Sequence, residues 1–199
     1  MDTQAIRAAL AAAPSSPTRE AAVLIPLVEG EGGLHIVLEV RALTLDVQPD
    51  DVCLPGGGIE AGETPQEAAV RETCEELLVS ASQIELMGCL GTQPGPGGLP
   101  LHVFVGQLHG YEGTFSHAEV DRVFELSLEW LLSHDPEVYD VTLEARFPAD
   151  YPWELVPGGR AYAWRNRVNH VPFYRGTDPL VWGATARVLA RFAKVLRRD

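Results

Sequence analysis

The sequence has few cysteines, and their spacing forms no cross-link or zinc-binding pattern. Cys53, Cys74 and Cys89 are the three among 199 residues, and none belongs to a C-x-x-C pair. An odd number without such pairs argues against a disulfide framework and against a cysteine zinc site. The six histidines form no H-E-x-x-H motif. We therefore interpret the cysteines as small buried thiols and the histidines as structural or solvated side chains.

Long apolar segments and basic charge are also scarce. No apolar run reaches the roughly 18 residues of a membrane span, and the N-terminus lacks the basic and apolar regions of a signal peptide. Lysine and arginine number 15 against 28 acidic residues, which gives a net charge of -13 and opposes nucleic acid binding through a basic surface. We expect a cytoplasmic protein that binds neither membrane nor nucleic acid, in which local cations attract any anionic ligand.

The composition is typical of a globular protein, with 46% hydrophobic and 22% charged residues. A chain of this length fits a single domain. We expect one domain over residues 1–199, with an N-terminal helix and linker over residues 1–17. An amphipathic helix over residues 179–196 should lie across a sheet.

Strand and helix patterns alternate along the chain. We expect a hairpin from residues 21–28 and 35–40, further strands at 86–90, 101–108 and 124–128, helices at 65–78 and 129–133, and weak strands near 164, 168 and 171–173. Residues 135–159 have no clear period, and we predict no regular structure there. Mixed elements of this kind predict an α/β fold, with a sheet covered on both faces by helices.

The helix at residues 65–78 has a well-specified beginning. Thr64 and Glu67 form a capping box, and Pro65 occupies the first helical position. At about 100° per residue, the next turns place carboxylates within roughly 100° of arc. These are Glu72, Glu75 and Glu76.

Three glutamates so placed repel one another, which favours a bound cation. Oxygen ligands of this kind suit Mg²⁺ or Mn²⁺. Ala68 and Ala69 flank this face, so we expect no bulky side chain to obstruct a ligand. Arg71 is placed to pair with Glu63 across the beginning of the helix. For the glutamates alone, however, a solvated helix face is the more common explanation.

The surrounding residues change that balance, because six specified positions follow the pattern G-x5-E-x7-R-E-x2-E-E. They are Gly57, Glu63, Arg71, Glu72, Glu75 and Glu76. This pattern resembles the Nudix box, and the chain is similar to Nudix hydrolases. The resemblance implies an α/β/α sandwich with a mixed sheet between helices, and hydrolysis of the acid anhydride in a nucleoside diphosphate. It also implies Mg²⁺ or Mn²⁺ as cofactor.

The resemblance assigns a role to each matched side chain. Glu72, Glu75 and Glu76 are expected to bind the metal, with Glu75, Glu76 and Arg71 counted among the catalytic residues. Glu63 and Arg71 are expected to support the box structurally. Leu78 departs from the pattern, since the family has glycine there to end the helix in a left-handed conformation. We expect a different helix end or a longer helix, without loss of activity.

A second resemblance, to the coenzyme A diphosphatase branch, covers segments scattered over the chain. They are Val40-Arg41-Ala42, Leu54-Pro55-Gly56-Gly57, Glu119-Val120, Val123-Phe124-Glu125-Leu126 and Trp182-Gly183-Ala184-Thr185-Ala186. The branch splits coenzyme A into 3',5'-ADP and phosphopantetheine. By that likeness Glu119 adds a catalytic carboxylate, while Arg41, Gly56 and Gly57 bind the substrate; a solvated loop position for Glu119 remains equally open.

Several alternatives remain open. Asp46, Gln48 and Asp50 stand where the branch has basic and glycine residues, which favours ADP-ribose or another nucleoside diphosphate derivative if that loop contacts the ligand. A catalytically silent, nucleotide-binding Nudix module is a rival from another class. Trp153, Trp164 and Trp182 could stack on adenine, although core packing is the more common use. A homodimer is possible, and the partner expected is a small-molecule nucleotide.

Overall fold

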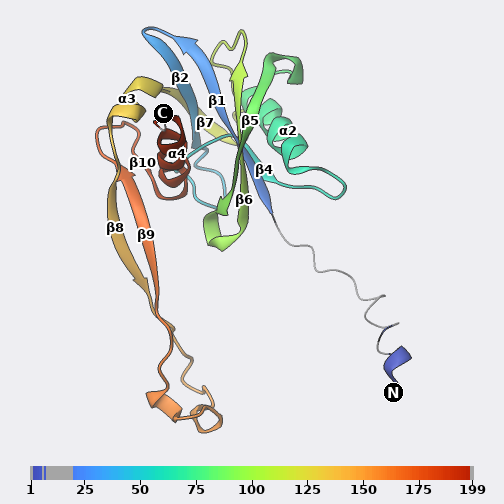
Figure 1. Cartoon of the computed structure of the whole chain (residues 1–199), viewed down its shortest axis with the longest axis vertical. Helices are drawn as coiled ribbons and strands as arrows, with labels where there is room; N and C mark the ends of the chain where they lie inside the picture. The colour runs from blue at the N-terminus through green and yellow to red at the C-terminus, as the bar shows by residue number, and fades with distance from the viewer. Residues whose placement is uncertain (1, 6, 8–19, 198–199) are drawn as a thin grey trace.

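The structure is a computed structural model that describes residues 2–5, 7 and 20–197. Its main sheet has the strand order β3-β2-β1-β6-β5, with β7 paired to β2 and β4 paired to β1, and a smaller sheet has the order β10-β9-β8. Figure 1 shows both sheets. The strands of the main sheet are β1 (Ala21–Gly30), β2 (Gly33–Arg41), β3 (Val52–Cys53), β4 (Gly56–Gly58), β5 (Ile84–Pro94), β6 (Pro100–Leu108) and β7 (Val120–Ser127).

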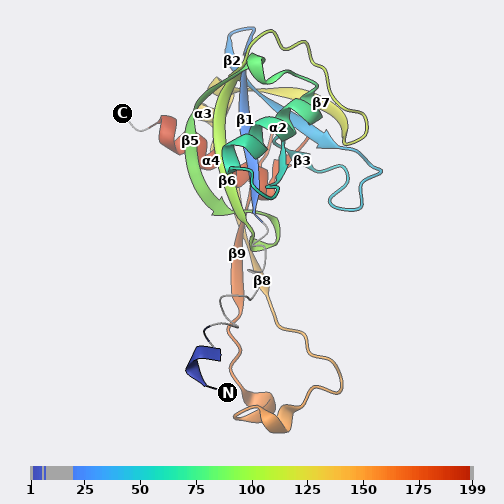
Figure 2. The ribbon, with the colours of Figure 1, turned by 90° about the vertical axis from the view of Figure 1, so that its right-hand side faces the viewer.

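The main sheet is mixed, which confirms the predicted α/β class. β1 and β2 form the expected antiparallel hairpin, whereas β1 and β6 run parallel. The helices α2 (Pro65–Leu77) and α4 (Gly183–Leu196) lie on opposite faces of the sheet (Figures 1 and 2). The short helix α3 (Leu128–Ser133) follows β7 as expected.

The two faces of the sheet carry separate hydrophobic cores. On β2, Ile36, Leu38 and Val40 pack in the core that includes α4, while Val37 packs in the core that includes α2. Because side chains of a strand alternate between faces, Glu39 points to the same face as Val37. A buried acidic residue therefore faces the helix that carries the box.

The prediction of no regular structure over residues 135–159 was wrong. β8 (Glu137–Leu143) pairs antiparallel with β9 (Arg167–Tyr174), and together they form an arm that projects away from the main sheet (Figures 1 and 2). Every residue of β8 is exposed. Since no face of this strand is buried, its sequence lacks the alternation that identifies a half-buried strand.

The end regions differ in part from the expectation. The C-terminal helix begins at Gly183 rather than near residue 179, because β10 (Val181–Trp182) pairs with the end of β9. The helix packs on the sheet as expected, through Val188, Leu189 and Phe192. The expected helix and linker over residues 1–17 lie largely outside the described residues. Within residues 2–5, 7 and 20–197, no helix has the length and apolar character needed to span a membrane.

Candidate active site

The beginning of α2 has the predicted capping box. The backbone N–H of Glu67 donates to Thr64 Oγ1 at 3.2 Å, and Thr64 N–H donates to Glu67 Oε2 at 2.8 Å. These bonds satisfy backbone donors that have no partner inside the helix. The cap fixes the first turn, and thereby the direction of every side chain after it.

The end of α2 differs from the expectation of a longer or altered helix. The helix ends at Leu77, and Leu78 adopts a left-handed conformation with φ 54° and ψ 42°. This conformation is the one that glycine adopts without strain, whereas a side chain makes it unfavourable by about 1–2 kcal/mol. The Leu78 side chain is 59% exposed, so burial offsets little of that strain.

Arg71 connects the helix to the glycine-rich loop. Its Nε donates to Glu63 Oε1 at 2.9 Å and its Nη2 to Glu63 Oε2 at 3.1 Å, which is the predicted pair in bidentate geometry. The bond from Arg71 lowers the pKa of Glu63. Nη2 of Arg71 also donates to Gly58 O at 3.1 Å. The pairing of Glu63 with Arg71 is confirmed.

The same guanidinium orients two of the box glutamates. Arg71 Nη1 donates to Glu72 Oε1 at 2.9 Å and to Glu75 Oε2 at 3.3 Å. Glu75 is exposed, whereas Glu72 is half-buried, and burial raises the pKa of Glu72. Arg71 thus binds the carboxylate of Glu63, which precedes the helix, and those of Glu72 and Glu75 on the helix itself.

Glu76 differs from the other box glutamates because it points into the molecule. It is 4% exposed, and its Oε2 accepts the Gly56 N–H at 2.7 Å. Burial raises the pKa of Glu76 to about 8, with further increases from Glu72 and Glu119. The expected carboxylate face is therefore partly an interior face.

The expected position of Ala68 and Ala69 was wrong. Both are fully buried in the core between α2 and the sheet, so they do not clear a path for a ligand. Ala69, Thr73 and Glu76 recur at i, i+4 and i+7, which is the spacing of a helix face turned toward a sheet. Glu76 belongs to that buried stripe.

Two glycines allow the loop to approach these carboxylates. Gly56 has φ of 151°, and a Cβ there would lie 2.6 Å from Val23 Cα. A Cβ on Gly57 would lie 2.5 Å from Glu72 Oε1. The clash at Gly56 is with backbone and therefore requires glycine, whereas a side chain at Gly57 would displace the Glu72 carboxylate.

Glu39, which was not among the predicted site residues, is 1% exposed. Its Oε1 has no hydrogen-bond partner among the described residues, while the Cys53 Sγ–H donates to Oε2 at 3.8 Å. Burial first, and the charge of Glu76 second, raise the pKa of Glu39 well above its ordinary value. The available signal was a single acidic residue inside the apolar run of residues 36–40.

Glu119 is exposed in the loop before β7, yet it belongs electrostatically to this group. Its charge raises the pKa of Glu39, Glu72 and Glu76. A backbone bond from Ala42 N to Glu119 O at 2.9 Å fixes the loop beside β2. We call Glu39, Glu72, Glu76 and Glu119 the carboxylate cluster.

The donor chemistry of the carboxylate cluster suits a hard divalent cation. Carboxylate oxygens are the preferred ligands of Mg²⁺ and Mn²⁺, and the buried Glu39 oxygen lacks a donor. In the part of the chain that the structure describes, no three acidic, histidine or cysteine side chains already converge as a metal centre. Arg71 and the Gly56 amide hold the box carboxylates instead.

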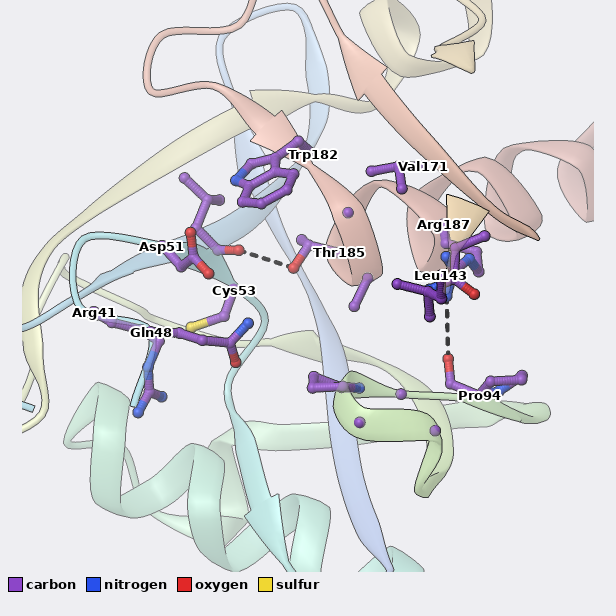
Figure 3. Close-up of a pocket in the computed structure, with 18 of the residues that line it drawn as sticks. Arg41, Gln48, Asp51, Cys53, Pro94, Leu143, Val171, Trp182, Thr185 and Arg187 are labelled. Atoms are coloured by element: carbon purple, nitrogen blue, oxygen red, sulfur yellow. Dashed lines mark hydrogen bonds between the residues drawn. The ribbon is translucent and has the colours of Figure 1, made fainter. Parts of the chain in front are cut away.

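A pocket lies between the main sheet and the arm. It has a volume of about 430 Å³, and its lining includes Arg41, Gln48, Arg167, Trp182 and Arg187. Figure 3 shows Arg41 and Arg187 at opposite sides of it. A smaller pocket of about 160 Å³ shares Arg41 and Gln48 with the first. We call the larger one the arginine pocket.

The smaller pocket connects the arginine pocket to the box. Its lining reaches Gly56 and Gly57, so the predicted substrate-binding residues Arg41, Gly56 and Gly57 share one hollow. Arg41 Nε donates to Val47 O at 3.3 Å. Of the three unusual loop positions, Gln48 lines both pockets, whereas Asp46 and Asp50 line neither.

Two other groups of side chains depart from the expected core positions. Trp182 is 40% exposed and stacks on Phe173 with a centroid separation of 5.5 Å, and Trp153 and Trp164 both contact Phe147 near the end of the arm. None of the three cysteines is fully buried as expected: Cys53 and Cys74 are partly buried, and Cys89 is exposed.

The fold and the box together define a class of α/β proteins with a carboxylate-rich helix beside a glycine loop. A family model for the NUDIX domain matches residues 18–151, which is more than half of the chain. The chain therefore belongs to the Nudix family.

Several curated proteins are similar to this chain. Nudix hydrolase 3 of Caenorhabditis elegans is 44% identical over 68 residues, which is 34% of this chain and 28% of that protein. The chloroplastic Nudix hydrolase 22 of Arabidopsis thaliana is 29% identical, covering 89% of this chain and 55% of that protein. The peroxisomal coenzyme A diphosphatase NUDT7 of Mus musculus is 27% identical, covering 87% and 69%. The chain thus spans little more than half, or less, of the first two relatives.

Among solved structures, a binary complex of Ap4A hydrolase from C. elegans is similar. Its sequence is 22% identical, the TM-score is 0.48, and the match covers 55% of this chain and 81% of that one. The strand order and the family match, rather than this likeness, carry the assignment above.

Proposed function

We propose that this chain is a divalent-metal-dependent diphosphatase that hydrolyses the acid anhydride of a nucleoside diphosphate. Its preferred substrate is coenzyme A or a derivative, which yields 3',5'-ADP and phosphopantetheine. The observation that carries the proposal is the carboxylate cluster beside the Gly56–Gly57 backbone. The 27% identity with a coenzyme A diphosphatase over 87% of the chain supports the substrate.

In this proposal the side chains of the box and Glu119 have different roles. Glu72, Glu75 and Glu76 hold Mg²⁺ or Mn²⁺, which, when bound, lowers the pKa of the attacking water and stabilises charge on the phosphoryl oxygens. Glu119 contributes a further carboxylate to the cation or to that water. Arg71 keeps Glu72 and Glu75 oriented through the bonds at 2.9 and 3.3 Å.

Substrate contacts come from the hollow beside the box. The Gly56–Gly57 backbone lets a diphosphate approach, because no side chain stands in its way, and Arg41 lies where the two pockets meet. The acidic residues Asp46 and Asp50 line neither pocket. Their charges are therefore a weaker objection to a substrate with an additional phosphate than the sequence suggested.

A substrate panel tests this function. Coenzyme A, ADP-ribose and other nucleoside diphosphate derivatives are incubated with Mg²⁺ or Mn²⁺, with and without chelator, and products are identified by mass spectrometry. We expect metal-dependent conversion of coenzyme A to its two phosphorylated fragments. Absence of turnover on every nucleotide would contradict the proposal, and tight binding without turnover would favour the silent module.

A further inference from the structure

The arginine pocket brings positive charge together in a strongly acidic protein. Arg167 comes from β9 and Arg187 from α4, while Asp51 is the one acidic side chain in the described lining. In a chain with a net charge of -13, such a concentration of guanidinium groups creates a local field of the opposite sign. Local cations of this kind attract anions that the rest of the surface repels.

The charges of Arg167 and Arg187 are not neutralised by the protein. Within the described part of the chain, neither forms an ion pair with a carboxylate. Arg187 donates to two backbone carbonyls, Pro94 O at 3.5 Å and His170 O at 3.1 Å. These bonds hold the guanidinium in place without cancelling its charge. Arg41 differs, because its charge lowers the pKa of Glu39 and Glu76.

The two ends of the arginine pocket differ in their distance from the box. The smaller pocket reaches Gly56 and Gly57 and joins the arginine pocket through Arg41 and Thr185. Figure 3 shows Arg41 at one side of the arginine pocket and Arg187 at the other. A ligand whose diphosphate lies at the box therefore extends toward Arg187.

We propose that Arg167 and Arg187 bind a phosphomonoester of the substrate that lies outside the scissile diphosphate. A guanidinium presents planar donors that match phosphate oxygens, and its charge strengthens each bond. The position of the diphosphate rests on the proposed function, but the phosphate subsite is testable by binding alone. The half-exposed Trp182 ring at the same pocket offers an apolar surface to the attached nucleoside.

The binding test compares two nucleotides that differ by one phosphate, 3',5'-ADP and 5'-AMP. Calorimetry on the full chain should give at least about tenfold tighter binding of 3',5'-ADP. Arg167→Gln and Arg187→Gln should each reduce this ratio toward one while changing the affinity for 5'-AMP little. Arg165→Gln is the matched control, since Arg165 is an exposed arginine outside the pocket lining.

Two variants are needed because Arg187 also bonds to the arm. Arg167 is an exposed residue of β9 and forms no side-chain hydrogen bond within the described residues, so its replacement removes charge without removing a hydrogen bond. Equal wild-type affinities for the two nucleotides would overturn the proposal. A preference that persists in both variants would overturn it as well.

A kinetic comparison separates the subsite from the proposed function. Coenzyme A and dephospho-coenzyme A differ by the 3'-phosphate, and we expect the wild-type chain to favour coenzyme A through KM rather than kcat. The Arg167→Gln variant should remove most of that difference. Turnover without any preference would overturn the subsite alone, whereas a preference in binding without turnover would overturn the diphosphatase and support the subsite.

Discussion

The carboxylate cluster and the arginine pocket have opposite charge and are built in different ways. In the carboxylate cluster, Glu72 and Glu76 lie on the capped helix α2, and Glu39 lies on β2, which faces that helix. Glu39 and Glu76 are almost fully buried. The arginines come from separate strands and a helix. Arg41 and Arg187 donate to backbone carbonyls, whereas the Arg167 side chain forms no hydrogen bond within the described residues. A buried acidic group is suited to holding a resident cation, whereas accessible arginines are suited to an anionic substrate that binds and dissociates. In our proposals the carboxylate cluster carries out the hydrolysis and the arginine pocket recognises the substrate.

The largest effect on the carboxylate cluster alone is expected from Glu76→Gln. The variant keeps the shape of the side chain and an acceptor for the Gly56 N–H, but it removes the charge from the cluster. Because a bound cation contributes several kcal/mol to the transition state, we expect kcat to fall by about 1000-fold or more. Steady-state kinetics with coenzyme A and Mn²⁺ measure this loss.

The matched control is Glu112→Gln, which removes an exposed carboxylate in a loop. Its turnover should remain within about twofold of the wild type. Affinity of Glu76→Gln for 3',5'-ADP should also change little, since the arginine pocket is intact. Retention of full turnover by Glu76→Gln would refute its assigned role.

The carboxylate cluster should also make the stability of the metal-free protein depend on pH. The pKa of Glu76 is raised from 4.5 to about 8, and that of Glu39 is also raised. Well below pH 4.5 both are protonated whether the chain is folded or unfolded, so the shift has no effect there. As pH rises to about 8, the unfolded chain releases protons that the folded chain keeps, and stability falls.

The measurable quantity is the free energy of unfolding of the wild type minus that of Glu76→Gln. We expect this difference to decrease by roughly 2–4 kcal/mol between pH 4.5 and pH 8, since raising a pKa by one corresponds to about 1.4 kcal/mol. Urea unfolding across that range provides the values. A difference independent of pH would show that Glu76 is not perturbed by burial.

A third change tests the close approach of the glycine loop. In Gly56→Ala, the new Cβ would meet the backbone of Ala22 and Val23, and the loop must move away from Glu76. We expect a loss of about 1–3 kcal/mol in stability together with lower turnover. Gly58→Ala is the control, because a Cβ there meets no atom within 4 Å, and its stability should change by less than about 0.5 kcal/mol.

The smallest effect concerns Leu78, which lies outside both regions. Leu78→Gly relieves the left-handed strain at an exposed position, so we expect the stability to rise by about 1 kcal/mol. Turnover should stay unchanged, because Leu78 is exposed and belongs to the lining of neither pocket beside the box. Thermal unfolding measures the gain, and a decrease in stability would contradict the strain that the backbone angle indicates.

Local sequence predicted the parts of the site that are close together along the chain. The capping box of Thr64 and Glu67, the pair of Glu63 with Arg71 and the strand hairpin all depend on short spacings. The inward direction of Glu76 was not predicted, because it depends on which face of α2 meets the sheet. The strand at residues 137–143 was not predicted, because it is stabilised by pairing with β9 and has no buried face that would produce an alternating pattern in the sequence.

The α/β class, the capped helix and the box can be read from the sequence, because each rests on periodicity or spacing within about twenty residues. The interaction of Glu39 with Glu76 and the meeting of Arg167 and Arg187 in one pocket depend on how the chain packs. Those contacts join residues that are distant in the chain, and no local pattern encodes them. Strand pairing and helix packing decide them, because these fix which side chains share a face.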